Sequence, residues 1–301
     1  MDILELTNVE KRFGERTVLK DLTLRVPEGA IYGFIGENGA GKTTTMKMIL
    51  GLLAADGGEI RVCGEKVSYG QTRTNRFVGY LPDVPEFYGY LTPTEYLLLC
   101  GGLAGVSASA SKSRAAELLS LVGLSESASR RIGGFSRGMK QRLGIAQALI
   151  HRPKLLICDE PTSALDPAGR KDIIDILRAI RSETTVLFST HILPDIERVC
   201  DQVGLLHGGK LALSGRLEEI RALHAKSGFV VEFTEEGEAS AFLAVSKNGE
   251  RDAATRLIYP TGTQADMLSA MSLLGQMQLC PLKIEQREPS LESLFMEAAA
   301  E

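Results

Sequence analysis

One stretch of the sequence constrains the fold more than any other: the glycine-rich run Gly36–Thr43, which follows the apolar residues Ile31–Ile35. Glycines allow successive N–H groups to point inward at one anion, and a helix starting here adds its unpaired N–H groups and positive end. Lys42 can reach the β- and γ-phosphates, and the Thr43 hydroxyl can bind Mg²⁺, which prefers oxygen ligands. We therefore predict a strand, a phosphate-binding loop and a helix. The candidate nucleotide-binding residues here are Asn38, Gly39, Ala40, Gly41, Lys42, Thr43 and Thr44.

Two further apolar runs end in polar side chains. Residues 155–158 lead into Asp159 and Glu160, and residues 186–190 lead into His191. Continuous apolar runs of this length are typical of central strands covered on both faces. Ligands of open parallel sheets bind outside the carboxyl ends of the strands, so we expect the three strand ends to meet at one crevice. There Asp159 would hold the magnesium ion, and Glu160 would polarise the water that attacks the nucleotide.

The rest of the chain predicts two additional parts. Leucines at helical spacing predict helices at 94–103, at 115–124 and after Ser136, which we interpret as a helical subdomain over about 84–150. After residue 220, short strands and helices alternate. Strands are expected at 228–233, 256–259 and 282–286, and helices at 239–245, 264–274 and 291–300.

The predicted fold class is α/β: a P-loop NTPase with a RecA-like core sheet and an inserted helical subdomain over 1–220, and a small C-terminal α+β domain over 221–301. The length of 301 residues is enough for both domains. The formal net charge of −4 gives no whole-chain basic field, so we expect no nucleic-acid partner. No apolar run reaches about 18 residues, so we expect no membrane-spanning helix. Five cysteines without a Cys-x-x-Cys pair argue against a disulfide framework or a zinc site.

The segment Phe135–Arg142, spelled FSRGMKQR, carries a family resemblance. It resembles the signature of the ABC ATPases, usually written LSGGQ and followed by QR. The resemblance implies that Ser136 and Gly138, at the start of a helix, form a second phosphate cradle that closes over ATP bound to an opposite copy. It therefore implies a head-to-tail dimer enclosing two ATP molecules, either a homodimer or a pair with a related ATPase subunit.

Other residues follow the order of that family between about residues 3 and 215. Phe13 stands where an aromatic ring stacks on adenine, and the alternative is an ordinary core phenylalanine. Asp166 belongs to Ser163–Asp166, which resembles the loop that crosses the dimer interface. His191 resembles the switch histidine that senses the γ-phosphate. The candidate catalytic residues are then Lys42, Asp83, Glu160 and His191.

The sequence departs from the family pattern at two places. In the signature, Arg137 replaces the first glycine, Met139 replaces the glutamine and Phe135 replaces the leucine. After the Gly-Tyr-Leu-Pro stretch the family places a glutamine, whereas this chain has Asp83. A carboxylate can still accept a hydrogen bond from metal-bound water, so we expect Thr43, Asp159 and Asp83 to be the metal-site residues.

Two short sequence segments indicate one branch of the family. The run before the phosphate loop and the terminal residues 289–295 are similar to ATPases of bacterial ABC-2 type exporters, including bacitracin-resistance and lantibiotic-immunity relatives. This resemblance implies a peripheral protein at the cytoplasmic face of the bacterial plasma membrane, which powers export through a separate multi-span permease subunit. The apolar segment 84–91 is either the surface for that partner or local packing of the helical subdomain.

Two other functions stay open at this point. One is a non-transport ABC ATPase acting on ribosomes or DNA. The chain argues against it because it has one cassette, no basic arm and no long insertion between the phosphate loop and Ser136. The other is a catalytically idle regulatory cassette, although the candidate catalytic residues are all present. The transported substrate cannot be read from this chain, because cargo contacts belong to the membrane subunit.

Overall fold

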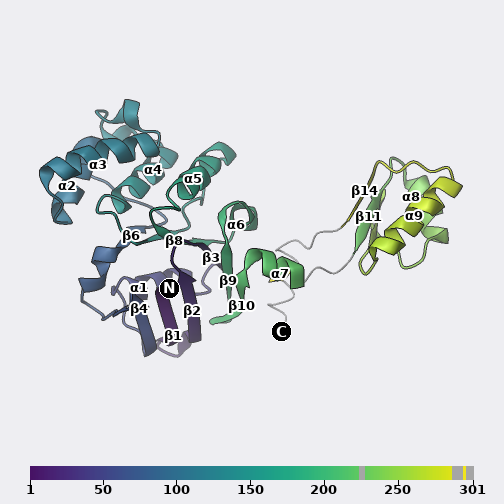
Figure 1. Ribbon diagram of the computed structural model, residues 1–301, viewed down its shortest axis with the longest axis horizontal. Coiled ribbons are helices and arrows are strands. Elements are labelled where there is room, and N and C mark those ends of the chain that lie inside the picture. The colour runs from purple at the N-terminus through teal and green to yellow at the C-terminus, as the bar shows by residue number, and fades with distance from the viewer. Residues whose placement is uncertain (224–227, 287–293, 296–301) are drawn as a thin grey trace. The chain divides into compact units, whose positions relative to one another are not determined.

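The computed structural model describes residues 1–223, 228–286 and 294–295. The chain divides into two compact units, one covering Met1–Leu217 and the other beginning at Glu218 (Figure 1). Among the described residues, the first unit contains two sheets and the second contains one. No helix in this part of the chain is long and apolar enough to cross a bilayer.

The first sheet of the first unit is antiparallel, with the strand order β2-β1-β4-β5. Buried and exposed residues alternate along much of β1 and β2, as expected for strands with one face on the core. Leu4 and Leu6 of the first strand point into the core with Leu22 and Leu24 of the second. The strands are β1 (Asp2–Phe13), β2 (Arg16–Pro27), β4 (Gly57–Val62) and β5 (Glu65–Lys66).

The second sheet has the order β10-β9-β3-β8-β7-β6 and is parallel except for the edge strand β10. Every residue of β3, β7 and β8 is buried, which confirms the prediction of central strands covered on both faces. These three strands are neighbours, so their carboxyl ends lie side by side. The strands are β3 (Ile31–Ile35), β6 (Val78–Leu81), β7 (Leu155–Asp159), β8 (Thr185–Thr190), β9 (Gln202–His207) and β10 (Lys210–Arg216).

One apolar core joins the two sheets through the helix α1 (Lys42–Ile49). Met46 of this helix packs in the same cluster as Leu6 of the first sheet and Phe34 and Ile157 of the second. The phosphate-loop helix is therefore fixed from both sides by buried apolar contacts. The first unit also contains the helices α5 (Pro167–Ala179) and α6 (Leu193–Val199) and short 3₁₀ turns at Arg73–Phe77, Ser125–Ser127 and Ile132–Gly134. The helix α7 (Leu217–Leu223) begins at the last residue of this unit and continues into the second.

The helices α2 (Pro93–Leu103), α3 (Ala108–Leu121) and α4 (Arg137–Ala148) lie together between β6 and β7 in sequence, which confirms the three predicted helices (Figure 1). The second of them begins earlier than predicted. Its first turns consist of small and polar residues without leucine spacing, and the Ser107 side chain caps it by accepting from the Ala110 backbone N–H.

The contact between α4 and β6 depends on Gly79, because a Cβ added there would lie 2.2 Å from the carbonyl oxygen of Ala148. We expect Gly79→Ala to lower the free energy of unfolding of the first unit by about 1–3 kcal/mol, the usual cost of overpacking. Urea unfolding of the full chain measures this. Gly102→Ala is the matched control, since the exposed helical Gly102 has open space around its Cβ position. Equal stability of Gly79→Ala and the parent would show that α4 can shift away from the strand.

After α7, the described part of the second unit consists of an antiparallel sheet of order β12-β13-β11-β14 and two helices. Phe229 and Val231 point to the same face of the sheet and share a core with Phe242 and Leu274 of the helices. Its elements are β11 (Phe229–Glu232), α8 (Glu236–Val245), β12 (Glu250–Ala253), β13 (Arg256–Tyr259), α9 (Gln264–Gln276) and β14 (Lys283–Gln286).

The sequence predicted an α+β architecture for this unit but not its edge strand β12. All residues of that strand are exposed and most are charged, so it has no hydrophobic pattern to recognise. The helix expected over 291–300 lies outside the described residues, apart from residues 294–295.

Candidate nucleotide-binding site

The loop between β3 and α1 has the predicted order of strand, glycine loop and helix. Gly41 is the N-cap of the helix with φ of 115°, a conformation that L side chains rarely adopt. A Cβ at this position would also lie 2.8 Å from the Leu19 side chain. The loop and the first residues of α1 line one crevice with Asp159 and Glu160. An anion in this crevice can approach the free N–H groups and positive end of α1.

Lys42 is 5% exposed and its ammonium group is held inside the site. Its Nζ donates to the carbonyl oxygens of Gly36 at 2.6 Å and Glu37 at 3.3 Å. The same Nζ lies 3.1 Å from Oε1 of Glu160. The lysine is thus close to the phosphate loop and already paired with the carboxylate at the end of β7.

Asp159 is 3% exposed and accepts hydrogen bonds from two hydroxyl groups. Thr43 Oγ1 donates to its Oδ2 at 2.7 Å, and Ser189 Oγ donates to its Oδ1 at 2.8 Å. The strands β7 and β8 run parallel with Asp159 opposite Ser189, which brings the serine to the carboxylate. The result is a cluster of hard oxygen ligands beside the start of α1, a donor set that suits Mg²⁺.

Glu160 follows this aspartate and has φ of 47°, in the left-handed region. Its backbone N–H is fixed by Ser189, which accepts through Oγ at 3.0 Å and through its carbonyl oxygen at 3.2 Å. The carboxylate is mostly buried, and its Oε2 lies 2.9 Å from Nδ1 of His191. Glu160 is thereby placed between a lysine on one side and a histidine on the other.

Asp83 lies just beyond β6 and is a further acidic residue of the site, away from the end of β7. Burial raises the pKa of its carboxyl group above the ordinary value, and the nearby charges of Asp159 and Glu160 add to the increase, whereas Arg137 lowers it. Its Oδ1 is buried without a hydrogen-bond partner and lies 3.6 Å from Nη2 of Arg137. Asp83 is therefore close enough to sense the acidic pair electrostatically.

A crevice of about 380 Å³ brings most of the predicted phosphate-site residues together. It is bounded by the loop, the start of α1 and the carboxylates at the strand ends. Two residues that the sequence did not suggest, Arg16 and Val18 of β2, also line it. The lining residues are Arg16, Val18, Glu37, Asn38, Gly39, Gly41, Lys42, Thr43, Thr44, Asp83, Asp159 and Glu160.

Other predicted residues are not part of this lining. Phe13 is 50% exposed under the Lys11 ammonium, which lies 5.3 Å from the ring centroid, so the alternative of a core phenylalanine is wrong. Ser136 is the N-cap of α4 and accepts from the Met139 N–H at 3.3 Å. Asp166 caps α5 by accepting from the Gly169 N–H at 3.2 Å.

Ser189 is a further residue of this site that sequence reasoning missed. It fixes both the Asp159 side chain and the Glu160 backbone, yet it is 0% exposed and sits within an apolar strand. Its position could have indicated this role, because a serine near the carboxyl end of a central strand can reach an acidic residue at the end of the neighbouring strand.

Comparison with known proteins shows the family of this chain. A model of the ABC transporter family matches residues 19–163. The uncharacterized ABC transporter ATP-binding protein YxlF of Bacillus subtilis is 37% identical, with 98% of each chain covered. This chain belongs to the ABC transporter ATP-binding proteins.

Several other relatives of this ABC protein carry more specific names. The bacitracin transport ATP-binding protein BcrA of Bacillus licheniformis is 36% identical over 98% of this chain and 96% of its own. The linearmycin resistance ATP-binding protein LnrL of Bacillus subtilis is 32% identical over 98% and 97%. The solved structure of an ATP binding subunit of an ABC transporter matches at a TM-score of 0.67 and 34% identity, covering 73% of this chain and 92% of that one. The chain is therefore the ATP-binding subunit of an ABC transporter, with the cassette fold and an additional C-terminal antiparallel sheet.

Proposed function

We propose that this ABC ATPase drives export through a separate multi-span membrane subunit, using Lys42, Glu160 and His191 for hydrolysis of Mg²⁺-bound ATP. The observation that carries the proposal is the chain of contacts at the strand ends. Glu160 pairs with Lys42 at 3.1 Å and with His191 at 2.9 Å, directly beside Asp159. A carboxylate held in this way, beside an anion-binding helix terminus, suits phosphoryl transfer, which depends on positioning and charge stabilisation.

Mg²⁺ would be held by Thr43, Asp159 and Asp83. The first two already share a 2.7 Å hydrogen bond, and Asp83 offers a buried oxygen that has no hydrogen-bond partner. When bound there, the ion would neutralise charge on the phosphate oxygens. In this scheme the ammonium of Lys42 leaves Glu160 and takes the β- and γ-phosphates, because their negative charge exceeds that of one carboxylate.

Glu160, freed from Lys42, would orient a water molecule and accept its proton as the water oxygen attacks the γ-phosphorus. The bond from the γ-phosphorus to the bridging oxygen then breaks, and that oxygen stays with ADP. His191 keeps the carboxylate in place through its Nδ1 contact and reports the presence of the γ-phosphate. Ser189 holds the backbone of Glu160 during this step.

The remaining predicted residues are assigned to a second copy or a related ATPase subunit. Ser136, Gly138 and Asp166 lie outside the crevice lining of their own chain, as expected if they act on ATP held by the opposite subunit. The half-exposed ring of Phe13 remains available to stack on adenine. Closure of the two copies over ATP and their separation after hydrolysis would drive the membrane partner.

The surface for that partner would be the segment 84–91. Val84, Tyr88 and Tyr90 are 60%, 55% and 68% exposed. The two tyrosine rings stack with centroids 5.9 Å apart, and a hollow of about 440 Å³ lies next to the segment. Exposed apolar side chains beside a hollow fit the insertion of a helix from a membrane subunit. Docking there would place the chain at the cytoplasmic face of a bacterial plasma membrane.

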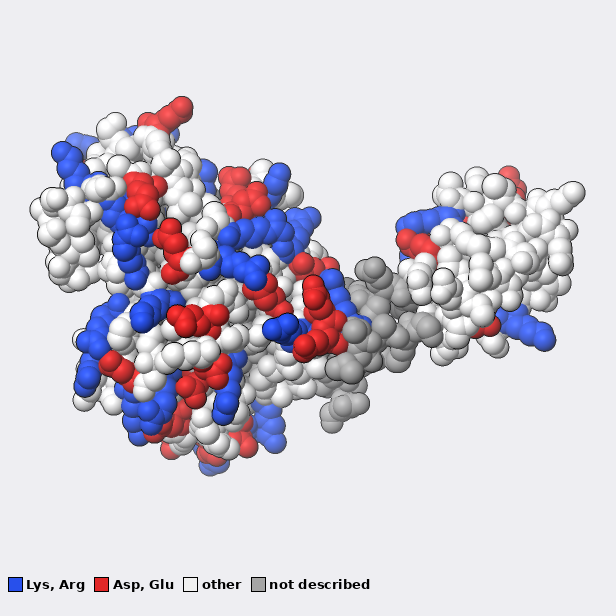
Figure 2. Space-filling model, viewed as in Figure 1, with Lys and Arg blue, Asp and Glu red and all other residues white. Residues whose placement is uncertain are grey.

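The names of relatives favour transport over the alternatives, since BcrA is a bacitracin transport protein and LnrL a linearmycin resistance protein. A ribosome- or DNA-bound ATPase would need a continuous basic surface. Figure 2 instead shows charges of both signs interspersed over the visible face of the first unit. We propose that the residues from about 221 onward form an accessory domain of the ATPase.

The direct test is hydrolysis by the purified chain together with capture of its partner from native membranes. We expect Mg²⁺-dependent release of phosphate from ATP that stops when EDTA is added. We also expect an affinity-tagged chain to retain a multi-span membrane protein, and the double substitution Tyr88→Ala and Tyr90→Ala to lose it while keeping basal hydrolysis. Hydrolysis that survives EDTA would contradict the metal assignment, and retention by the double variant would contradict the docking surface.

A further inference from the structure

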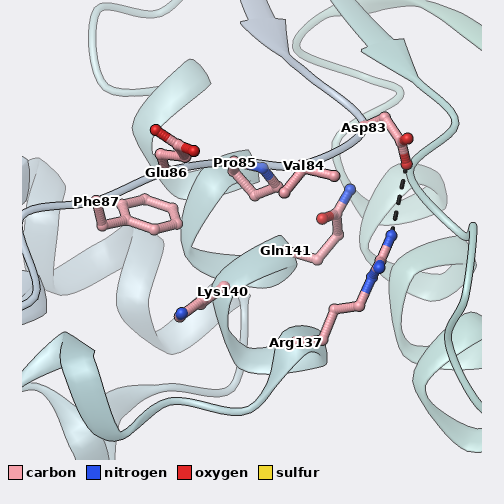
Figure 3. A pocket seen from close by; sticks show the side chains of 8 residues that line it. All are labelled: Asp83, Val84, Pro85, Glu86, Phe87, Arg137, Lys140 and Gln141. Carbon is pink, nitrogen blue, oxygen red and sulfur yellow. Dashed lines mark ion pairs between the residues drawn. The ribbon is translucent and has the colours of Figure 1, made fainter.

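The two places where this chain departs from the ABC pattern meet in space. Asp83 stands where the family has glutamine, and Arg137 stands where the signature has glycine. Their side chains, from the loop after β6 and from the first turn of α4, point toward one another, with Oδ1 and Nη2 3.6 Å apart (Figure 3). Two charges have replaced two neutral residues, and the charges are of opposite sign.

Asp83 also stands at the boundary of two hollows. It lines the nucleotide crevice together with Asp159 and Glu160, and it lines the 440 Å³ hollow together with Arg137 and Gln141. The Asp83 carboxylate therefore lies where it borders both the nucleotide crevice and the hollow that contains the Arg137 guanidinium. No other residue among the described ones lines both of these hollows.

The contact with Arg137 is loose. The 3.6 Å separation exceeds a hydrogen bond, and Oδ1 has no hydrogen-bond partner although it is buried. About half of each side chain is exposed, which weakens the attraction through solvent screening. Arg137 thus attracts the carboxylate by charge alone, whereas the Ser163 side chain donates a hydrogen bond to Asp83. A stronger cation can draw the carboxylate away from Arg137.

The charges around Asp83 set its preferred partner in each state. Without a cation, the carboxylates of Asp159 and Glu160 repel it from the crevice, and Arg137 attracts it toward α4. A dication at the Thr43 and Asp159 oxygens reverses the sign of the field that Asp83 meets. The same carboxylate then gains more from the crevice than from the arginine.

We propose that Arg137 is a positioning residue that competes with Mg²⁺ for Asp83. In the nucleotide-free chain Arg137 holds Asp83 against α4, and loading with Mg²⁺ and ATP transfers Asp83 to the metal and releases Arg137. This rests on the proposed function, because it takes Asp83 as a metal-site residue. Ser136 and Gly138 lie at the start of the same helix as Arg137. Binding of Mg²⁺ in one copy therefore affects the phosphate cradle that this copy offers to the ATP of the opposite copy.

The test is a Mg²⁺ titration of binding, free of turnover. A fluorescent, non-hydrolysable ATP analogue at fixed concentration is mixed with the full chain, and the half-saturating Mg²⁺ concentration is read from the fluorescence. We expect Arg137→Gln to lower this concentration about two- to fivefold, since it removes the competitor of an exposed pair. Arg137→Lys should restore the parent value. Asp83→Asn should raise the concentration, and adding Arg137→Gln to it should have no further effect.

The matched control is Arg181→Gln, which removes another exposed arginine paired with an aspartate, Asp201 at 2.9 Å. It should leave the half-saturating Mg²⁺ concentration unchanged, and circular dichroism checks that each variant is folded. An unchanged value in Arg137→Gln, or an effect of Arg137→Gln that persists in the Asp83→Asn background, would overturn the competition. A parent chain that fails to bind the analogue, or binds it equally without Mg²⁺, would instead overturn the proposed function itself.

Discussion

Glu160→Gln is expected to bind ATP at least as tightly as the parent and to hydrolyse it about 10²–10⁴-fold more slowly, the usual contribution of a general base. The amide keeps the size of the side chain but does not accept the proton of the attacking water. It also removes the negative charge 3.1 Å from Lys42, so the ammonium group is freer to meet the triphosphate. Phosphate release and fluorescence titration with ATP measure the two effects separately.

The same variant should accumulate as a dimer when ATP and Mg²⁺ are present, because the closed state is no longer reopened by hydrolysis. Size-exclusion chromatography with and without ATP shows this. Glu126→Gln, at an exposed position of the helical part, is the control and should turn over ATP at the parent rate. If Glu160→Gln hydrolyses ATP like the parent, another group orients the water.

Lys42→Ala is expected to weaken ATP binding about 10- to 150-fold, the loss of a hydrogen bond from a charged donor to the phosphates. No other lysine lies in the crevice lining of the described residues to replace it. The substitution also leaves the mostly buried Glu160 without its lysine, so the folded state must be checked by thermal unfolding. Binding is measured by titration with a fluorescent ATP analogue.

Lys47→Ala is the matched control for this substitution, because Lys47 lies on the same helix and is exposed. It should bind and hydrolyse ATP like the parent. Normal turnover in Lys42→Ala would count against the assignment of the whole loop, since the phosphates would then be neutralised elsewhere.

The central features of the fold could be predicted from local patterns. The strands β3, β7 and β8 are continuous apolar runs because both of their faces are covered, and a run of this kind is visible in the sequence. Ser136, placed before apolar residues at helical spacing, predicts the start of a helix, and its side chain does cap α4. By contrast, the exposed and charged β12 exists only because β13 supplies hydrogen bonds to it.

Within the site, residue types could be predicted but their pairings could not. The carboxyl ends of parallel strands were expected to meet, and Asp159 does lie opposite Ser189. The contacts of Glu160 with both Lys42 and His191 depend on side-chain directions that no sequence period encodes. The pairing of Asp83 with Arg137 belongs to the same class, because it joins a loop to a helix far away in the sequence.

The left-handed backbone of Glu160 has a consequence for anyone who redesigns this chain. A φ of 47° favours glycine or asparagine, and a glutamate there carries a conformational cost of about 1–2 kcal/mol. A design procedure that rewards local backbone preference would therefore choose to replace this residue early. The resulting protein would lose the backbone strain at that position together with the proposed catalytic carboxylate. Position 160 should therefore be held fixed in any thermostabilisation of the cassette.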